Sequence, residues 1–215
     1  MDIDMEICQA TMGQQDNDRW WTERGHRITA SKFGRIMSAR GDDSLRRLHR
    51  DMTAPPSTYV PAACRMGIAE EGNAKRTYIK YKMEVEGVTV SVAPVGLCVP
   101  NWSTKIASSP DGIVVTAGNH HVLEIKCIYD KNTYPKSIAD IARERGSRFY
   151  CTVDEDGALE LRKNHQYYYQ VLGEMATTGL HQAAVNSHHE SYITHGRMRL
   201  GFSRFHSIGR SGGES

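Results

Sequence analysis

The sequence lacks a long apolar stretch, a signal peptide and any paired cysteine motif, and each absence argues against a class of protein. No apolar run approaches the roughly 20 positions that a membrane-spanning helix requires, so we expect no membrane attachment. The N-terminal MDIDMEICQA does not have the basic and then apolar order of a signal peptide. The five cysteines are scattered without a CxxC pair, which predicts reduced thiols instead of disulfides or a zinc site. We therefore expect an intracellular protein, in the cytoplasm or, in a eukaryotic host, in the nucleus.

A large net charge and several common catalytic motifs are also missing. The formal net charge is only +2, so overall charge does not indicate a nucleic-acid partner. Neither the phosphate-cradling GxxxxGK[ST] nor the nucleophile turn GxSxG occurs. The charge is unevenly distributed, because residues 19–50 contain nine Lys or Arg and only three acidic residues. That basic segment fits a groove for a polyanion, although on charge alone solvated helix faces explain it better.

Length and composition indicate one globular domain. A chain of 215 residues, 39% hydrophobic and 24% charged, is long enough to bury one sizeable core. We expect a loose polar segment over 1–17, a single domain over 18–208 and a flexible tail over 209–215. Predicted helices come first, strands in the middle, and a helix with further strands at the end. This order predicts an α/β (α+β) fold with a central mixed sheet flanked by helices.

Periodicity and turn residues locate the individual elements. Helices are predicted at 31–38, 44–52, 61–83, 134–145 and 164–178. Strands are predicted at 87–93, 96–99, 105–108, 112–116 and 122–127, with a hairpin formed by 149–153 and 158–162.

The most informative segment is a pair of predicted strands joined by a short turn. Asp111 lies in a Ser-Pro-Asp-Gly just before the first strand, and Glu124 and Lys126 lie on the second. Because side chains alternate along a strand, Glu124 and Lys126 share a face, and the turn can bring Asp111 beside Glu124. Two carboxylates can hold a hard divalent cation, and the ammonium can steady an attacking hydroxide. Each part alone is usually a surface turn or a solvated face, but together they resemble the PD-(D/E)xK nuclease core.

Four other residues have both a chemical and a structural interpretation. Glu71 lies on a stripe of small or apolar residues, so its carboxylate either faces a metal or pairs with a nearby Lys or Arg. The Gln170 amide either hydrogen-bonds a metal ligand or belongs to a solvated helix face. Ser31 lies near a predicted helix N-terminus with Arg24 seven residues before it. That pair fits a phosphate site, or an N-cap and a surface Arg.

Five motifs in order resemble the lambda-exonuclease family, also called the YqaJ-type viral recombinase nucleases. They extend over about residues 20 to 180. They are W-x-x-x-R-x-x-x-I-T-A-S (Trp20, Arg24, Ile28 to Ser31), G-x-x-x-E (Gly67, Glu71), S-P-D-G (Ser109 to Gly112), L-E-I-K-C (Leu123 to Cys127) and Y-x-Q-V (Tyr168 to Val171). The order of five motifs is much more specific than the D…ExK core by itself.

The resemblance implies a fold, an activity and site roles. Members of the family degrade one strand of linear duplex DNA from the 5′ end with magnesium. Better-known members form trimeric rings and work with a single-strand annealing protein. By this resemblance Asp111, Glu124 and the Ile125 carbonyl would bind Mg²⁺, for which Mn²⁺ is an expected substitute, and Glu71 would help hold a second ion. Lys126 would position the attacking water, Gln170 would support the site, and Arg24 with Ser31 would bind the 5′-phosphate.

The sequence departs from the family pattern at two positions, and two other functions fit the same residues. Ile128 replaces a Pro that often follows L-E-x-K-C, and Leu172 replaces a second Gln found in some members. The expected function is a metal-dependent 5′ to 3′ DNA exonuclease in recombination or DNA processing. The alternatives are an endonuclease on the same core and a non-catalytic DNA-binding recombination module. The intact Asp111, Glu124 and Lys126 argue against the non-catalytic module.

Overall fold

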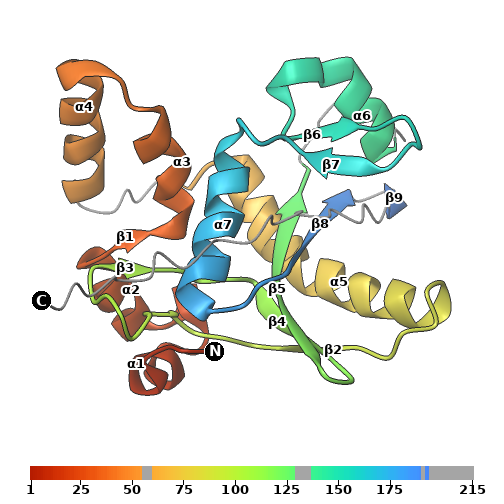
Figure 1. The fold of residues 1–215 in the computed structure, drawn as a ribbon, viewed down its shortest axis with the longest axis horizontal. Coiled ribbons are helices and arrows are strands. Elements are labelled where there is room, and N and C mark those ends of the chain that lie inside the picture. The colour runs from red at the N-terminus through yellow and green to blue at the C-terminus, as the bar shows by residue number, and fades with distance from the viewer. Residues whose placement is uncertain (55–59, 129–136, 190–191, 194–215) are drawn as a thin grey trace, which may run out of the picture.

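A five-stranded mixed sheet forms the centre of the protein (Figure 1). The computed structural model describes residues 1–54, 60–128, 137–189 and 192–193. Across the sheet the strands are β2 (Ser91–Ala93), β4 (Gly112–Thr116), β5 (Asn119–Cys127), β8 (Ala183–His189) and β9 (Tyr192–Ile193). The β2–β4, β4–β5 and β8–β9 pairs are antiparallel, and β5 and β8 are parallel. The fold is therefore the predicted mixed sheet of an α/β protein.

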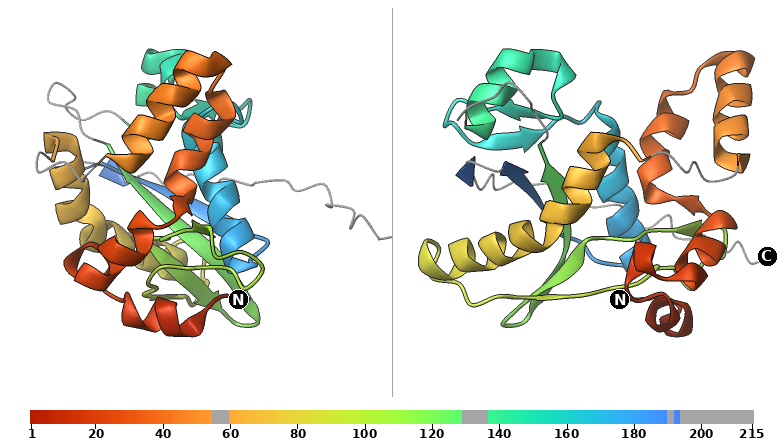
Figure 2. Two further views of the ribbon diagram at one scale, coloured as in Figure 1. Left: turned by 90° about the vertical axis from the view of Figure 1, so that its left-hand side faces the viewer. Right: turned by 180° about the vertical axis from the view of Figure 1, so that it is seen from behind.

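Two long helices cover opposite faces of this sheet (Figure 2). Helix α5 (Ala62–Glu84) packs Ala74 and Tyr78 on Leu123 of β5. Helix α7 (Gln166–Thr178) lies on the other face, where Val171 belongs to a second apolar cluster with Val122. Leu123 and Val122 thus point in opposite directions from the same strand, as the two-residue period of a strand requires.

The segment over residues 18–53 builds a third layer against α7. It contains α2 (Asp18–Gly25), β1 (Ile28–Thr29), α3 (Ala30–Ser38) and α4 (Gly41–Thr53), and β1 pairs in parallel with β3 (Ile106–Ala107). Helices α3 and α7 approach closely because glycines lie between them. A Cβ at Gly34 would lie 2.5 Å from the Gln166 Cα, and one at Gly173 would lie 2.7 Å from the Phe33 ring. This contact fixes the start of α3 relative to α7.

Two lobes rise above the sheet on either side of α7 (Figure 1). One is α4. The other combines α6 (Ile138–Arg145), the 3-10 turn η2 (Gly146–Arg148) and the antiparallel hairpin of β6 (Cys151–Val153) and β7 (Leu159–Leu161). The predicted hairpin is confirmed, and Ile138 and Ile141 anchor this second lobe in the same apolar cluster as Val171.

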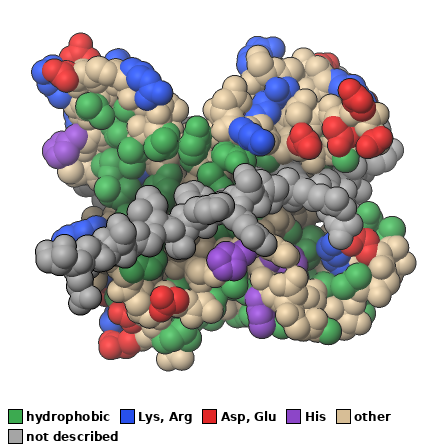
Figure 3. Space-filling model, in the orientation of Figure 1, with side chains coloured by type: hydrophobic (Ala, Val, Ile, Leu, Met, Phe, Trp, Pro, Cys, Tyr) green, Lys and Arg blue, Asp and Glu red, His purple; other side chains and the backbone are tan. Residues whose placement is uncertain are grey.

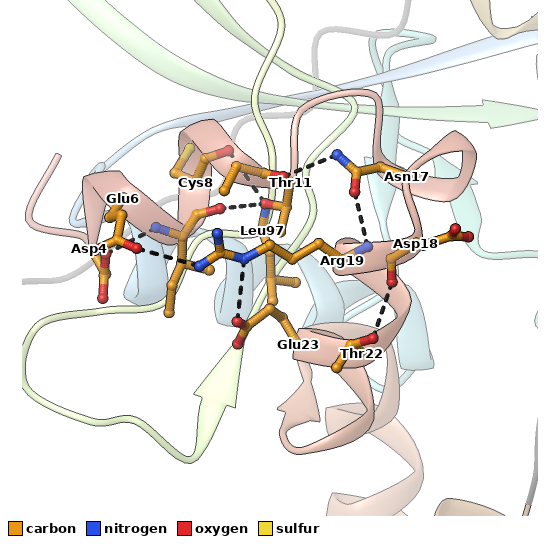
Figure 4. Close-up of polar contacts among 12 residues, drawn as sticks. Asp4, Glu6, Cys8, Thr11, Asn17, Asp18, Arg19, Thr22, Glu23 and Leu97 are labelled. Atoms are coloured by element: carbon orange, nitrogen blue, oxygen red, sulfur yellow. Dashed lines mark hydrogen bonds and ion pairs between the residues drawn. The ribbon is translucent and has the colours of Figure 1, made fainter.

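The segment over residues 1–17 is folded, so the expectation of a loose N-terminus is wrong. It forms α1 (Met5–Ala10) and the 3-10 turn η1 (Gln14–Asp16), and Cys8 is buried. Thr11 accepts a hydrogen bond from the Leu97 backbone N–H (2.7 Å), in the network of polar contacts drawn in Figure 4. The Gln14 amide donates to the carbonyls of Val95 (2.9 Å) and Pro110 (2.8 Å). These contacts attach the segment to the chain just before Asp111.

Other element boundaries differ by a few residues or more. The helix predicted over 61–83 and the strand over 112–116 are confirmed. The strand over 87–93 shortens to Ser91–Ala93, and 96–99 supplies only a single bridge, Cys98 to Ser108. Residues 134–136 of one predicted helix, and the tail over 209–215, lie outside the described residues. All five cysteines are free, and no helix in the described part of the chain is long and apolar enough to cross a membrane.

Candidate active site

The β4–β5 hairpin brings Asp111 and Glu124 together, as their spacing predicted. Its loop contains only Ala117 and Gly118, and Gly118 has φ +80°, a conformation that glycine adopts without strain. The register pairs Gly112 with Leu123, so Asp111 lies one step further along, beside Glu124. The Asp111 Oδ2 accepts a hydrogen bond from the Ile125 N–H (2.5 Å). This carboxylate therefore continues the strand pairing beyond the end of β4.

The Lys126 ammonium is held from three directions. It forms an ion pair with Glu124 Oε1 and lies 3.3 Å from Gln170 Oε1. It also lies 4.1 Å from the centroid of the Tyr167 ring, a cation–π contact. Burial, the largest single influence, lowers the pKa of Lys126, but Glu124, together with Tyr167 and Glu174, raises it above its usual value. Lys126 is therefore a fixed cation that donates hydrogen bonds.

Gln170 connects this ion pair to a carboxylate that the sequence analysis missed. Its Nε2 donates to Glu124 Oε1 (2.6 Å) and to Glu174 Oε1 (2.9 Å). Glu174 is 1% exposed, and burial followed by the nearby Glu124 raises its pKa well above the usual range. The signal in the sequence was the spacing of four residues, which places Gln170 and Glu174 on one face of α7.

Glu124 and Glu71 are paired with lysines, whereas Asp111 and Glu174 have no ion-pair partner among the described residues. Burial, then Glu124 and Glu71, raises the pKa of Asp111 well above its usual range. Glu124 Oε2 and Glu174 Oε2 are buried without a hydrogen-bond partner. Unpartnered carboxylate oxygens close to one another suit a hard cation, which prefers oxygen ligands. The donor set therefore fits a divalent ion held by two carboxylates and a backbone carbonyl, although no three His, Cys, Asp or Glu side chains of the described residues are grouped to hold one.

Arg24 and Ser31 lie at the junction of α2 and α3. The Arg24 Nη2 donates to Ser31 Oγ (3.3 Å), and its guanidinium lies 4.6 Å from the centroid of the Trp20 ring. Trp20 Nε1 in turn donates to Ser109 Oγ (2.8 Å), two residues before Asp111. Burial lowers the pKa of Arg24, and none of the described carboxylates forms an ion pair with it. An anionic ligand would compensate this partly buried cation.

The start of α3 adds hydrogen-bond donors to this corner. Thr29 is the N-cap of α3, but its side chain makes no capping hydrogen bond to the helix and contacts Ser31 Oγ instead (3.1 Å). Backbone N–H groups in the first turn of a helix have no partner within the helix and favour anions. The corner thus combines a guanidinium, a hydroxyl and a helix N-terminus.

One cavity of about 540 Å³ joins the two groups of residues. Six of the predicted site residues line this cavity, namely Arg24, Ser31, Glu71, Asp111, Glu124 and Gln170. Glu174, which was not predicted, also lines it. Lys126 and Ile125 do not line it, but both contact residues that do. Glu71 enters from α5 and forms an ion pair with Lys75 (2.5 Å), one of the partners that the sequence allowed. The fold therefore brings together, around one cavity, side chains that are spread over about 150 residues of the sequence.

Some of the basic residues in the segment 19–50 form ion pairs within the chain. Arg27 pairs with Glu23 (2.7 Å), Arg35 with Asp51 (2.6 Å) and Arg46 with Asp43 (2.9 Å). Basic and acidic side chains accordingly lie together on the lobe formed by α4 in Figure 3. Arg24 is the basic residue of this segment that lines the cavity.

Comparison with solved structures supports the fold. The alkaline exonuclease LHK-Exo from Laribacter hongkongensis has a TM-score of 0.56 and 20% identity, over 82% of this chain and 76% of that one. The structure of LHK-Exo in complex with dAMP has a TM-score of 0.51 and 21% identity, over 80% and 73%. At these identities the likeness concerns the fold.

Sequence comparison identifies the family. No curated protein is significantly similar to the chain. Residues 19–181 match the YqaJ-like viral recombinase domain, an interval that includes all five motifs and every residue of the candidate site. This chain therefore belongs to the family of YqaJ-like viral recombinase domains.

Proposed function

We propose that this protein is a metal-dependent exonuclease that degrades linear duplex DNA from the 5′ end, in recombination or DNA processing. The observation that carries the proposal is the single cavity that joins Asp111 and Glu124 to Arg24 and Ser31. A hydrolytic centre and an anion site in one cavity are what an enzyme needs to cut next to a terminal phosphate. LHK-Exo is an alkaline exonuclease and was solved with dAMP, a deoxynucleoside monophosphate, which is in line with this proposal.

The carboxylates would hold the catalytic ion. Asp111, Glu124 and the Ile125 carbonyl would bind Mg²⁺, with Mn²⁺ as a substitute, and Glu71 would help hold a second ion. Such an ion supplies Lewis-acid stabilisation of the phosphodiester oxygens and lowers the pKa of an attacking water. Glu71 would take that role through the carboxylate oxygen that is not paired with Lys75.

Lys126 would orient the attacking water. Because its pKa is raised, the ammonium keeps its proton, and it would place the attacking water and stabilise the negative charge that develops on it. The Glu124 carboxylate, the Gln170 amide and the Tyr167 ring keep the ammonium in place. Gln170 would therefore support the site indirectly, by holding the side chains of Glu124 and Lys126.

The corner formed by Arg24 and Ser31 would bind the 5′-phosphate and so restrict the enzyme to DNA ends. A terminal phosphate carries more negative charge than a bridging one, and a guanidinium with helix N–H groups favours the larger charge. A single-strand annealing protein as partner and a trimeric ring remain expectations from the family resemblance. An endonuclease on the same core is the competing function.

One digestion separates these two functions. An end-labelled linear duplex and a covalently closed circle of the same sequence are incubated with the protein and Mg²⁺, with Asp111→Asn as the inactive control. Loss of the linear substrate with an intact circle is the expected result. Nicking of the circle at a comparable rate would refute the exonuclease and support the endonuclease.

A further inference from the structure

Glu174 is the most enclosed carboxylate of the site, and no role in the proposed chemistry accounts for it. It is 1% exposed, whereas Glu124 is 3% exposed and Glu71 retains a third of its side-chain surface. Glu174 lines the same cavity as Asp111 and Glu124. It lies one helical turn beyond Gln170 on α7, so both side chains reach the polar face of β5.

One oxygen of Glu174 fixes the orientation of the Gln170 amide. The two hydrogens of Gln170 Nε2 are directed at Glu124 Oε1 and Glu174 Oε1. The amide oxygen faces the Lys126 ammonium at 3.3 Å. A rotated amide would turn its oxygen toward two carboxylates and its nitrogen toward a cation, which is repulsive on both sides. The amide is therefore locked by a carboxylate on each of its hydrogens.

Orienting the amide does not require a carboxylate. A neutral acceptor would do so without the free energy that burial of a charge costs. The second oxygen, Glu174 Oε2, is buried and has no hydrogen-bond partner, and the same is true of Glu124 Oε2 in the same cavity. No Lys, Arg or His of the described residues forms an ion pair with Glu174. A buried acid with a free oxygen beside two proposed cation ligands points to a ligand that brings positive charge.

We propose that Glu174 is a positioning residue for the cation site, a role that rests on the proposed function. Through Oε1 it holds the Gln170 amide, which in turn holds Glu124 in place to bind the ion. Through Oε2 it supplies a further acceptor and negative charge for the hydration shell of a divalent cation. Residues that hold and orient the direct ligands of a metal typically change its affinity by about 10- to 100-fold when removed.

The test measures Mn²⁺ binding to the DNA-free protein by electron paramagnetic resonance. Glu174→Gln keeps the size and one acceptor but removes the charge, and we expect it to weaken Mn²⁺ binding about tenfold or more. Its thermal stability should be unchanged or higher, because the carboxyl group is buried at a cost in free energy and one of its oxygens has no hydrogen-bond partner. The matched control is Glu160→Gln, an exposed acid on β7, which should bind Mn²⁺ as the wild type does. Wild-type affinity in Glu174→Gln would overturn the proposal.

A double-mutant cycle tests whether Glu174 acts through Gln170. Glu174→Met, which has no comparable acceptor, and Gln170→Ala should together weaken Mn²⁺ binding by less than the product of their separate factors. Independent factors would refute the positioning role. Asp111→Asn distinguishes this outcome from failure of the proposed function itself. If the wild type and Asp111→Asn bind Mn²⁺ equally, the metal site is misplaced and the role of Glu174 falls with it.

Discussion

The two faces of β5 are buried to the same extent but have opposite chemistry. On one face Leu123 is fully buried and packs with Ala74 and Tyr78 of α5. On the other face Glu124 is 3% exposed, yet one of its oxygens has no partner. Burial of apolar area stabilises a fold, whereas burial of unpartnered charge destabilises it. One strand therefore has an apolar cluster on one face and, on the other, beside Val122, the residues that we propose carry the chemistry.

This contrast makes the two faces separable by mutation. Substitutions under α5 should change the free energy of unfolding and leave the chemistry of each folded molecule intact. Substitutions of the carboxylates that face α7 should change the chemistry at little cost in stability, as is common when a strained functional site is relieved, whereas the apolar residues of that face, such as Val122 and Val171, also stabilise the fold.

The largest effect is expected at the proposed metal ligands. Asp111→Asn or Glu124→Gln should abolish cleavage of linear duplex DNA, because the charge that holds the ion is lost. Chelation of the metal should have the same result. Affinity for DNA, measured by fluorescence anisotropy, should persist, since the proposed phosphate contacts lie on α2 and α3. Near wild-type rates in either variant would end the assignment of these two carboxylates.

The opposite face should show the reverse pattern. Leu123→Ala removes a fully buried side chain next to Tyr78, so we expect the free energy of unfolding to fall by about 2–5 kcal/mol. Urea denaturation measures the loss, and the cleavage rate per folded molecule should stay close to that of the wild type. Leu123→Met is the matched control, with an expected loss under about 1.5 kcal/mol. A collapse of activity without a change in stability would break the comparison between the faces.

The sequence predicts the hairpin site well because the controlling signals are local. Alternation along residues 122–127 places Glu124 and Lys126 on one face, and Gly118 supplies the positive φ that a two-residue loop needs. The long helix over 62–84 was equally easy to predict from the sequence, because its stripe of small and apolar residues repeats over more than six turns. The order of the motifs also identified Arg24 as a site residue, although its contact with the site depends on the packing of α2.

What the sequence does not predict depends on contacts between distant segments. Helix α1 has only six residues, too few to display a period, and η1 is held by Gln14 bonds to carbonyls at 95 and 110. Glu174 occupies a helix position between core residues, where its side chain could have been solvated. Only the placement of α7 over β5 shows that it is enclosed and next to Gln170.

A smaller effect on the polar face is expected at Lys126. Lys126→Ala removes the donor proposed to hold the attacking water, which should lower the cleavage rate by about 10²-fold. The variant should still fold, because the apolar clusters are intact, but with reduced stability, because Glu124 loses its buried ion pair. Single-turnover rates with saturating Mg²⁺, together with thermal unfolding, measure both quantities. An unfolded variant, or a fully active one, would make Lys126 a structural residue that belongs with the other face.

The smallest effect concerns the preference for one kind of DNA end, and it tests whether the cavity binds the 5′-phosphate. The Arg24 guanidinium has Ser31 and the Trp20 ring as neighbours and no carboxylate partner among the described residues. A terminal phosphate should compensate that charge, and one charge-assisted contact contributes roughly 1.5–3 kcal/mol. A 5′-phosphorylated duplex should therefore be digested about tenfold to a hundredfold faster than the same duplex with a 5′-hydroxyl. Arg24→Ala should erase most of this preference while the slower rate on the 5′-hydroxyl substrate stays the same, since Asp111 and Glu124 are untouched. Equal wild-type rates on both ends would remove the phosphate site and shift the interpretation toward an endonuclease built on the same polar face.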